Sequence, residues 1–288
     1  MKLFQYIDDK GQKKLGLCIG EQYVNVEETV KKSQSTLPMT MKQILESNLS
    51  MRQLEEKYRA LTPVLLKKEE IHFAPVMDAG EKILCVGLNY QAHMDETGMN
   101  EKTDFPPLFP KFGNCLIGNN QAIHIPENAK QFDYEAELVI VIGKEAHCVE
   151  KEHALEYVFG YTIGNDFSAR DLQLKSGQWT LGKVCDEFAP IGPYLVTADE
   201  INPNSLEITC TVNQQVRQHS NTSHMIYSCA DIISYISQYI TLKPGDMIFT
   251  GTPDGVILGS KGEYEWLKRG DKIVVSIEKI GELHNSVQ

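Results

Sequence analysis

The stretch Phe132-Asp-Tyr-Glu-Ala-Glu-Leu-Val-Ile-Val-Ile-Gly143 guides the interpretation of the rest of the chain. It is rich in β-branched and apolar residues and ends on glycine, which predicts a β-strand that runs into a turn. Side chains alternate between the two faces of a strand, so Glu135 and Glu137 should share a face, one rung apart. Two ionised carboxylates this close repel each other unless a cation lies between them. Oxygen ligands of this kind suit Mg²⁺ or Mn²⁺ better than zinc.

The same pattern has a simpler interpretation, which is an exposed acidic face on an edge strand. A Glu-x-Glu pair by itself favours this simpler interpretation, because such short motifs often match by chance. A third carboxylate changes the balance: Asp166 follows a second predicted strand at residues 158–164. Asn165-Asp166 alone would more often form a turn, so the metal site depends on all three carboxylates together.

The totals describe an ordinary globular chain with enough length for a large core. It has 288 residues, of which 42% are hydrophobic, so a small second domain is plausible. The formal net charge is -11 and the sequence pI is about 5.2. This acidity argues against nucleic acid or an anionic membrane as the main partner. The acidity does not exclude a small anionic substrate, because a bound divalent metal can reverse the local electrostatic field.

The seven cysteines are scattered, odd in number and never spaced as Cys-x-x-Cys. This usage argues against a disulfide framework or a structural zinc and favours reduced thiols. The first residues reach Asp8 too early to contain the apolar core of a signal peptide. No apolar run approaches the ~20 residues that a membrane span needs. We therefore expect a cytoplasmic protein without a membrane segment.

The sequence predicts two domains, residues 1–75 and 76–288. Short alternating segments at 2–7, 14–19 and 22–26 predict a small antiparallel meander. Residues 41–60 carry spaced aliphatic residues among charges and predict one or two short helices. A charged connector, Lys67-Lys68-Glu69-Glu70, precedes the predicted boundary near residue 75.

From residue 82 the pattern changes to short strands interrupted by glycine and proline. Residues 83–87 form a buried-strand pattern, and 89–96 predict a helical turn in which His93 and Glu96 share a face. The segment that follows has one glycine and three prolines, so residues 89–110 are a candidate lid over a site. Further strands are predicted at 158–164, 193–197, 206–212, 246–250 and 272–277, with short helices at 153–157 and 229–239. The larger domain is therefore mainly β with few helices, an α+β class.

Six motifs in fixed order resemble the fumarylacetoacetate hydrolase family over residues 82–277. They are Gly-x-Asn-Tyr-x-x-His-x-x-Glu (87–96), Pro-Lys-Phe (110–112), Asp-Tyr-Glu-x-Glu (133–137), Asn-Asp with Arg-Asp-Leu-Gln (165–173), Gly-Lys-x-x-Asp-x-Phe-Ala-Pro-x-Gly-Pro (182–193) and Thr-Gly-Thr-Pro-x-Gly-Val (250–256). Each is weak alone, and their order makes the resemblance strong. The Trp-x-x-Gly-Lys run at 179–183 and residues 195–200 look like the branch that holds oxaloacetate decarboxylases and sugar-acid diketone hydrolases.

The resemblance implies a distorted β-roll in the larger domain, beside a small N-terminal β/α domain, usually in a homodimer. It also implies that Glu135, Glu137 and Asp166 hold Mg²⁺ or Mn²⁺. The substrates that it implies are small 2-oxo acids or diacids, whose carboxylate and keto oxygens chelate the metal. The metal would then stabilise the enolate formed when the C3–C4 bond of the substrate breaks.

The remaining site residues also follow from the resemblance. Lys183 would place a positive charge beside the developing oxyanion. His93, oriented by Glu96, would deprotonate a water that attacks the C4 carbonyl of a 2,4-dioxo acid. The other predicted substrate ligands are Lys111, Arg170, Gln173 and Thr252.

Several alternatives stay open at this point. His93 has the simpler interpretation of a buried histidine capped by Glu96. In oxaloacetate, loss of CO₂ would give the same enolate without an attacking water. A hydratase or isomerase of 2-oxo-enoic acids needs the same enolate, and a catalytically silent binding protein would keep only the fold. The intact set of predicted site residues argues against a silent protein.

Overall fold

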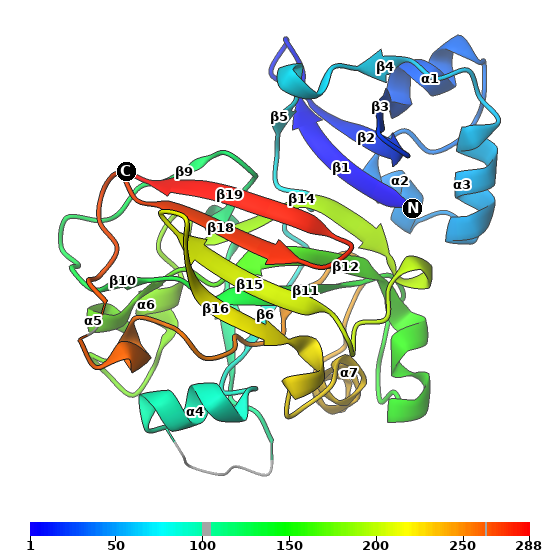
Figure 1. The fold of residues 1–288 in the computed structure, drawn as a ribbon. Helices are drawn as coiled ribbons and strands as arrows, with labels where there is room; N and C mark the ends of the chain where they lie inside the picture. The colour runs from blue at the N-terminus through cyan, green and yellow to red at the C-terminus, as the bar shows by residue number, and fades with distance from the viewer. Residues whose placement is uncertain (100–104, 263) are drawn as a thin grey trace.

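The computed structural model describes residues 1–99, 105–262 and 264–288. Within these ranges most strands belong to one 12-stranded sheet, which runs the length of the molecule (Figure 1). Its order is β4 (Leu65–Leu66), β3 (Gln22–Asn25), β2 (Lys13–Ile19), β1 (Lys2–Ile7), β14 (Ala189–Thr197), β12 (Val158–Asn165), β11 (Ala136–Ile142), β17 (Met247–Phe249), β6 (Ile83–Val86) and β7 (Leu108–Lys111), with β5 (His72–Phe73) on β1 and β8 (Leu116–Ile117) on β14.

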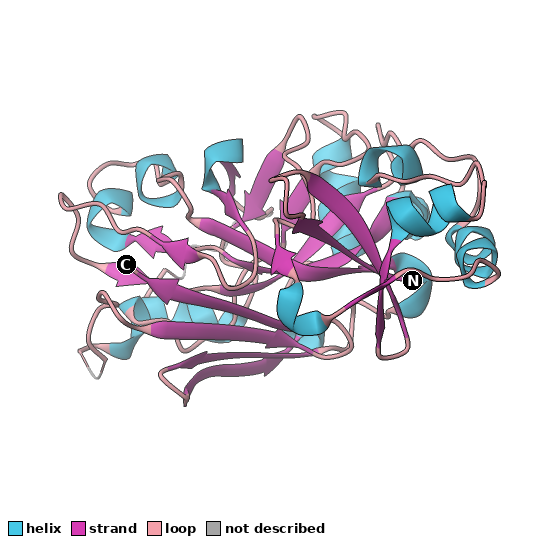
Figure 2. Cartoon of the chain, turned by 90° about the horizontal axis from the view of Figure 1, so that it is seen from above, coloured by secondary structure: helices cyan, strands magenta, loops and turns pink. Residues whose placement is uncertain are grey.

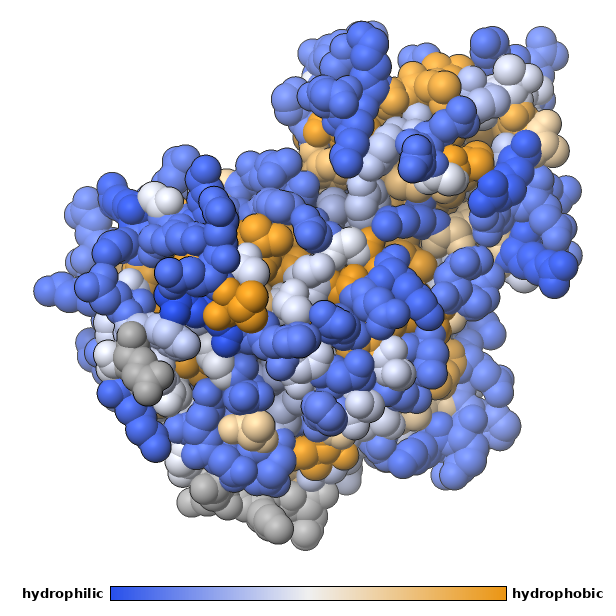
Figure 3. Space-filling model, in the orientation of Figure 1, coloured by the Kyte–Doolittle hydropathy of each residue, from blue (hydrophilic) through white to orange (hydrophobic). Residues whose placement is uncertain are grey.

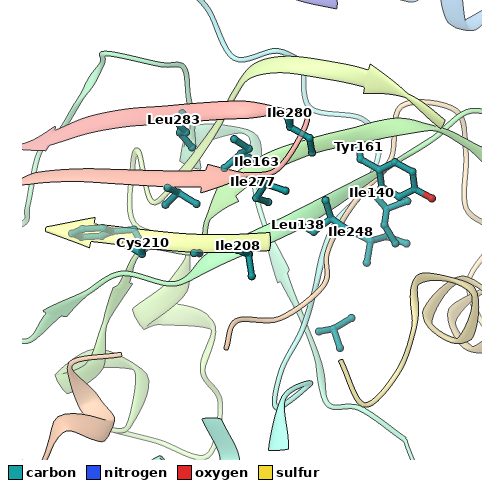
Figure 4. Packing of buried hydrophobic residues seen from close by; sticks show 14 of the residues in the cluster. Leu138, Ile140, Tyr161, Ile163, Ile208, Cys210, Ile248, Ile277, Ile280 and Leu283 are labelled. Carbon is teal, nitrogen blue, oxygen red and sulfur yellow. The ribbon is translucent and has the colours of Figure 1, made fainter. Parts of the chain in front are cut away.

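A second sheet of five strands packs against this one. Its order is β16 (Gln215–Asn221), β15 (Glu207–Val212), β18 (Lys272–Ile277), β19 (Gly281–Val287) and β9 (Ala122–Ile123). Alternate residues of β15 and β18 are buried, as expected when one face of a sheet covers a core. Figure 4 shows Ile208 and Ile277 from this sheet beside Leu138 and Ile163 from the large sheet. The mainly β architecture predicted from the sequence is confirmed.

Helices lie around the sheets rather than between them (Figure 2). The α-helices of the described residues are α1 (Val26–Lys32), α2 (Met41–Leu45), α3 (Met51–Arg59), α4 (Gln91–Thr97), α5 (Arg170–Gln173), α6 (Thr180–Lys183) and α7 (Cys229–Ser237). Short 3₁₀ turns are η1 (Lys68–Glu70), η2 (Gly113–Cys115), η3 (Lys151–Tyr157), η4 (Ala198–Glu200), η5 (Thr222–His224) and η6 (Leu258–Ser260). In the described part of the chain, no helix has the length and apolar composition to span a bilayer.

The N-terminal meander and the helices α2 and α3 lie where the sequence predicts them. The short helix α1 was not predicted, because Val26 and Val30 favour strands by propensity and its Asn25 N-cap is a local signal. Strand β1 pairs with β14 through Lys2–Val196 and Leu3–Leu195, so the large sheet continues through the N-terminal segment. The domain boundary at residue 75 stays a prediction.

The strand predicted across residues 132–143 is interrupted. β10 (Phe132–Asp133) pairs with β13 (Ser168–Ala169), and the seven residues of β11 then join the large sheet. Glu135 lies between these two strands, so simple alternation along one strand does not describe its orientation. Both neighbours of β11 are strands, β12 and β17, which excludes an exposed edge strand.

Polar residues cover most of the face shown in Figure 3, and apolar residues appear there as separate patches. The predicted lid falls partly on residues 100–104, which lie outside the described residues. Of the rest, the predicted helical turn is α4, and residues 108–110 lie in β7. A lid that orders over the substrate stays a prediction.

Candidate active site

Three carboxylates from separate segments converge at the start of β11. Oxygens of Glu135, Glu137 and Asp166 lie within 4.8 Å of one another, and all three side chains are buried. The end of β12 brings Asp166 to the others, because Glu137 pairs with Gly164 in the β11–β12 ladder. Glu135 N–H donates to Asn165 Oδ1 at 3.0 Å, and Asp166 N–H donates to Glu135 O at 3.0 Å. We call these three residues the acidic triad.

Three buried cations, Lys111, Arg170 and Lys183, lie against the triad. Lys183 Nζ is 2.7 Å from Glu135 Oε2 and 2.9 Å from Asp166 Oδ2. Arg170 Nη2 is 2.7 Å from Glu135 Oε1. Glu137 differs from its neighbours, because it accepts a hydrogen bond from Gly251 N–H at 2.7 Å and forms no ion pair within the described residues. Glu137 is therefore the triad carboxylate whose negative charge is least compensated by nearby cations and donors.

The pKa values follow this asymmetry. Burial opposes the ionisation of Glu135, but Lys183 and Arg170 lower its pKa to about 2. Burial and the charges of Asp166 and Glu135 raise the pKa of Glu137 well above its ordinary value. Burial also raises the pKa of Asp166, although Lys111 and Lys183 oppose that change. Burial disfavours the ammonium form of Lys183, yet Asp166 and Glu135 raise its pKa overall.

His93 and Glu96 lie together on α4, as their spacing predicts. His93 Nδ1 is 2.9 Å from Glu96 Oε1, and His93 is 7% exposed. Glu96 also accepts Gly255 N–H at 2.9 Å and Val256 N–H at 3.4 Å, so three donors surround its carboxylate when Nδ1 carries the proton. In that tautomer Nε2 of His93 is left as a proton acceptor.

The four predicted substrate ligands have different surroundings. Arg170 Nη1 donates to Gln173 Oε1 at 2.9 Å, and both residues line the same cavity as Glu135 and Glu137. Thr252 lines the cavity too and accepts a hydrogen bond from Gln218 Nε2 at 2.8 Å. Lys111 is outside this lining, and its ammonium contacts Asp166 Oδ1 at 2.7 Å and backbone carbonyls of Lys183 and Phe188. These contacts favour a role for Lys111 in holding Asp166 in place over a role as a substrate ligand. The roles of all four residues stay predictions.

These groups line one small cavity. Its polar side is formed by Glu135, Glu137, His93, Arg170 and Lys183, with Gln173 and Thr252. Its lining also includes the apolar residues Leu88, Met99, Phe109, Trp179 and Leu258. Charged and polar groups that converge on one cavity suit a small anionic molecule.

Some residues of the site had no role assigned from the sequence. Asp133 was in the quoted motif but had no assigned role, although it is fully buried and 2.9 Å from Arg170 Nε. Gln218 fixes Thr252 from the polar strand β16, which lacks the alternation that would have predicted it. Trp179 packs so closely that a Cβ added at Gly87 would be 2.6 Å from its ring. Such contacts arise from the fold and have no local pattern.

The donor set fits a divalent cation. Carboxylate oxygens are the preferred ligands of Mg²⁺ and Mn²⁺, and the triad offers three of them around one point. Burying Glu137 without a cation is unfavourable, which a bound ion would offset. The triad is the only such group of three found among the described residues. This chemistry does not separate Mg²⁺ from Mn²⁺.

Comparison with known families agrees with this geometry. The family model described as fumarylacetoacetate (FAA) hydrolase C-terminal matches residues 82–288. The chain belongs to the fumarylacetoacetate hydrolase family. The resemblance predicted from the six motifs is thereby confirmed.

Two curated relatives show the range of names within this family. A protein of Dictyostelium discoideum, named fumarylacetoacetate hydrolase domain-containing protein 2 homolog, is 47% identical over 72% of this chain and 71% of its own length. The Rattus norvegicus protein named mitochondrial oxaloacetate tautomerase Fahd2a is 38% identical over 87% of this chain and 80% of its own.

Solved structures share the fold. A fumarylacetoacetate hydrolase of Exiguobacterium antarcticum superposes with a TM-score of 0.83, is 32% identical and covers 100% of this chain and 99% of its own. A fumarylpyruvate hydrolase of Pseudomonas aeruginosa, solved with Mn²⁺ and pyruvate, has a TM-score of 0.67 and 34% identity over 75% of this chain and 91% of its own. Both of these proteins are named as hydrolases, and one of them was solved in complex with Mn²⁺ and pyruvate.

Proposed function

We propose that this protein is a divalent-metal-dependent enzyme that forms the enolate of a small 2-oxo acid, with tautomerisation of oxaloacetate as its reaction. The observation that carries the proposal is the buried triad of Glu135, Glu137 and Asp166 with Lys183 against it. The name of the rat relative, which is similar over most of both chains, supports oxaloacetate as the first substrate to test.

The triad would hold Mg²⁺ or Mn²⁺, which when bound supplies Lewis-acid stabilisation of negative charge on the 2-keto oxygen. Lys183 adds a fixed positive charge on the same side of the cavity, where exclusion of water strengthens it. Arg170, Gln173 and Thr252 offer donors to the carboxylate of the substrate.

His93 is the proposed proton carrier. With Nδ1 held by Glu96, Nε2 is free to take a proton from C3 of the keto form and to return it in the reverse direction. The backbone N–H groups of Gly255 and Val256 stabilise the negative charge on Glu96. Glu96 therefore keeps the imidazole in the tautomer that this step requires.

A second candidate function is cleavage of the C3–C4 bond, either by hydrolysis of an acylpyruvate or 2,4-dioxo acid or by decarboxylation of oxaloacetate. The same His93–Glu96 pair favours hydrolysis, because a base in this position can activate water as well as move a C3 proton. The fumarylpyruvate hydrolase of known structure supports this candidate.

The two candidates are separated by their products. Oxaloacetate supplied as the enol should convert to the keto form with loss of ultraviolet absorbance, and without release of pyruvate. Pyruvate is followed in parallel with lactate dehydrogenase and NADH, using oxaloacetate and a series of acylpyruvates. Metal alone, protein with EDTA, and Lys183→Met protein with metal are the controls, because free metal ions also catalyse these reactions. Pyruvate release without faster tautomerisation would replace the first candidate by the second.

The assembly and the compartment of the protein are further proposals. The family resemblance supports a homodimer, which light scattering coupled to size exclusion would test directly. The cytoplasmic location predicted from the sequence stays a prediction, and the rat relative is named as mitochondrial.

A further inference from the structure

Asp133 is a buried aspartate beside the triad that has no role in the proposed function. It ends β10 and is fully buried. Its Oδ2 lies 2.9 Å from Arg170 Nε and accepts Leu258 N–H at 3.0 Å. Its Oδ1 accepts Tyr134 N–H and Ile257 N–H, both at 2.9 Å. Four donors therefore surround a carboxylate that does not belong to the triad, and they stabilise its negative charge.

Arg170 connects this aspartate to the triad. Its Nε contacts Asp133, its Nη2 is 2.7 Å from Glu135 Oε1, and its Nη1 donates to Gln173 at 2.9 Å. The guanidinium is 2% exposed, so water screens neither contact appreciably. One positive charge is thus shared between Asp133 and a triad carboxylate.

The formal charges of the cluster show what this sharing does. Four carboxylates and three cations, all ionised, leave one net negative charge: Asp133, Glu135, Glu137 and Asp166 against Lys111, Arg170 and Lys183. Without the charge of Asp133, the cluster would be neutral before any metal arrives. Charge at these distances has a large effect on a divalent ion in a buried site.

We propose that Asp133 is a positioning residue: it shares Arg170 with Glu135 and thereby keeps the triad negative enough to bind its divalent cation. This inference rests on the proposed function, because it assumes a metal at the triad. It assigns Asp133 a part in metal affinity that is separate from its part in holding Ile257 and Leu258.

The inference predicts the direction in which each of three variants changes metal affinity. In Asp133→Asn the charge of Arg170 acts on Glu135 alone, so metal affinity should fall. In Arg170→Gln the competing cation is removed, so metal affinity should rise. In the double variant the formal charge of the cluster equals that of the wild type, so affinity should return close to the wild-type value. A purely structural role for Asp133 would not produce this pattern.

The test is calorimetric titration of metal-free protein with Mn²⁺. We expect Asp133→Asn to bind about tenfold more weakly and Arg170→Gln about tenfold more tightly, with the double variant within about threefold of the wild type. Asp171→Asn is the matched control, because Asp171 is adjacent in sequence to Arg170 but caps Lys130 N–H and Leu172 N–H outside the cluster. Thermal unfolding of each metal-free variant checks the fold.

The outcomes distinguish the inference from the function on which it rests. If the wild type and Asp133→Asn bind Mn²⁺ equally well, the inference is overturned and the proposed function is not. The same holds if the double variant binds Mn²⁺ no more tightly than Asp133→Asn. The amide of Asp133→Asn would face the donors of Arg170 and Leu258, so this variant can fail to fold. In that case Arg170→Gln decides: unchanged or weaker binding overturns the inference. Wild-type protein that binds no divalent ion overturns both.

Discussion

Glu137 is the residue at which binding and stability oppose each other. It is buried beside two other carboxylates, and its only contact to a donor among the described residues is the N–H of Gly251. A buried carboxylate without a cation destabilises the folded metal-free protein. The same lack of compensating positive charge would favour a cation bound beside it.

Glu137→Gln should therefore raise the melting temperature of the metal-free protein and eliminate the further increase that Mn²⁺ gives the wild type. Scanning calorimetry with EDTA and then with Mn²⁺ measures both effects. The exposed Glu152→Gln is the control and should behave as the wild type in both conditions. An equal increase with Mn²⁺ in Glu137→Gln would contradict the metal site.

Substitution of His93 should separate hydrolysis from decarboxylation, the two forms of C3–C4 bond cleavage. His93→Ala should reduce acylpyruvate hydrolysis by ~10²–10⁴-fold, because that reaction needs a base to activate water. Decarboxylation of oxaloacetate needs no such base and should be affected far less. Lys183→Met should impair every reaction, since it removes the positive charge beside Glu135 and Asp166. Values of kcat/KM for both substrates from one preparation provide the comparison, and equal losses for His93→Ala would rule out activation of water as its main role.

The sequence predicts those site residues that carry a local pattern. Glu135, Glu137 and Asp166 flank strand patterns, and His93 and Glu96 have helical spacing, so each pair or group could be placed before the structure was known. Strand alternation predicted that Glu135 and Glu137 lie close together, and they do. The single strand assumed for that prediction is wrong, because Glu135 lies between β10 and β11 rather than within a strand. Asp133 and Gln218 depend on long-range contacts to Ile257 and Thr252, which no local pattern encodes.

At the scale of elements, the segment 251–258 organises the site through its backbone. Its successive N–H groups donate to three different carboxylates: Gly251 to Glu137, Gly255 and Val256 to Glu96, and Ile257 and Leu258 to Asp133. A glycine is required where this segment passes β16, since Gly255 has φ +99° and an added Cβ would be 2.0 Å from Arg217 O. The sequence marked this segment only by the motif Thr-Gly-Thr-Pro-x-Gly-Val at 250–256, which does not indicate these acceptors.

Gly255→Ala should displace the segment and lower both stability and activity. Gly270→Ala is a matched control, because Gly270 has φ +96° and no atom within 4 Å of an added Cβ. Both variants incur the strain of a left-handed backbone, of order 1–3 kcal/mol, and only Gly255→Ala adds a collision with backbone. Urea unfolding and turnover of oxaloacetate should show the larger loss for Gly255→Ala, and equal losses would mean that the segment adapts.

Strands without hydrophobic alternation limited the prediction of elements. β16 has one buried residue among seven, Gln218, and β19 alternates polar and apolar side chains too weakly to be recognised. Pairing with β15 and β18 forms these strands, because their backbone hydrogen bonds complete an existing sheet. Tertiary contacts therefore determine these two strands, which the hydrophobic pattern of the sequence does not indicate.

At the scale of the whole molecule, the large sheet joins the N-terminal meander to the strands that carry the triad. β14 pairs with β1 on one side and with β12 on the other, and β12 ends at Asn165, the residue before Asp166. Phe4 of β1 strengthens this junction by edge-on contacts with Tyr194 of β14 and Phe73 of β5. A sheet that is continuous across the predicted boundary at residue 75 should unfold together with its core.

We therefore expect one cooperative unfolding transition for the whole chain, with intrinsic fluorescence and circular dichroism changing at the same urea concentration. Phe4→Ala should lower the free energy of unfolding by ~3–5 kcal/mol, because it leaves a cavity in a fully buried aromatic cluster. Phe112→Ala is the control of the same residue type, and at 51% exposure it should cost less than ~0.5 kcal/mol.

Mn²⁺ should stabilise the wild type and Phe4→Ala by the same amount, since Phe4 is not among the residues that line the cavity. That equality matters, because it requires the metal site and the N-terminal meander to unfold in one step. Two transitions in Phe4→Ala, of which Mn²⁺ raises only the second, would show instead that the N-terminal segment unfolds first. The boundary at residue 75 would then separate two cooperative units, despite the continuous hydrogen bonding between β1 and β14.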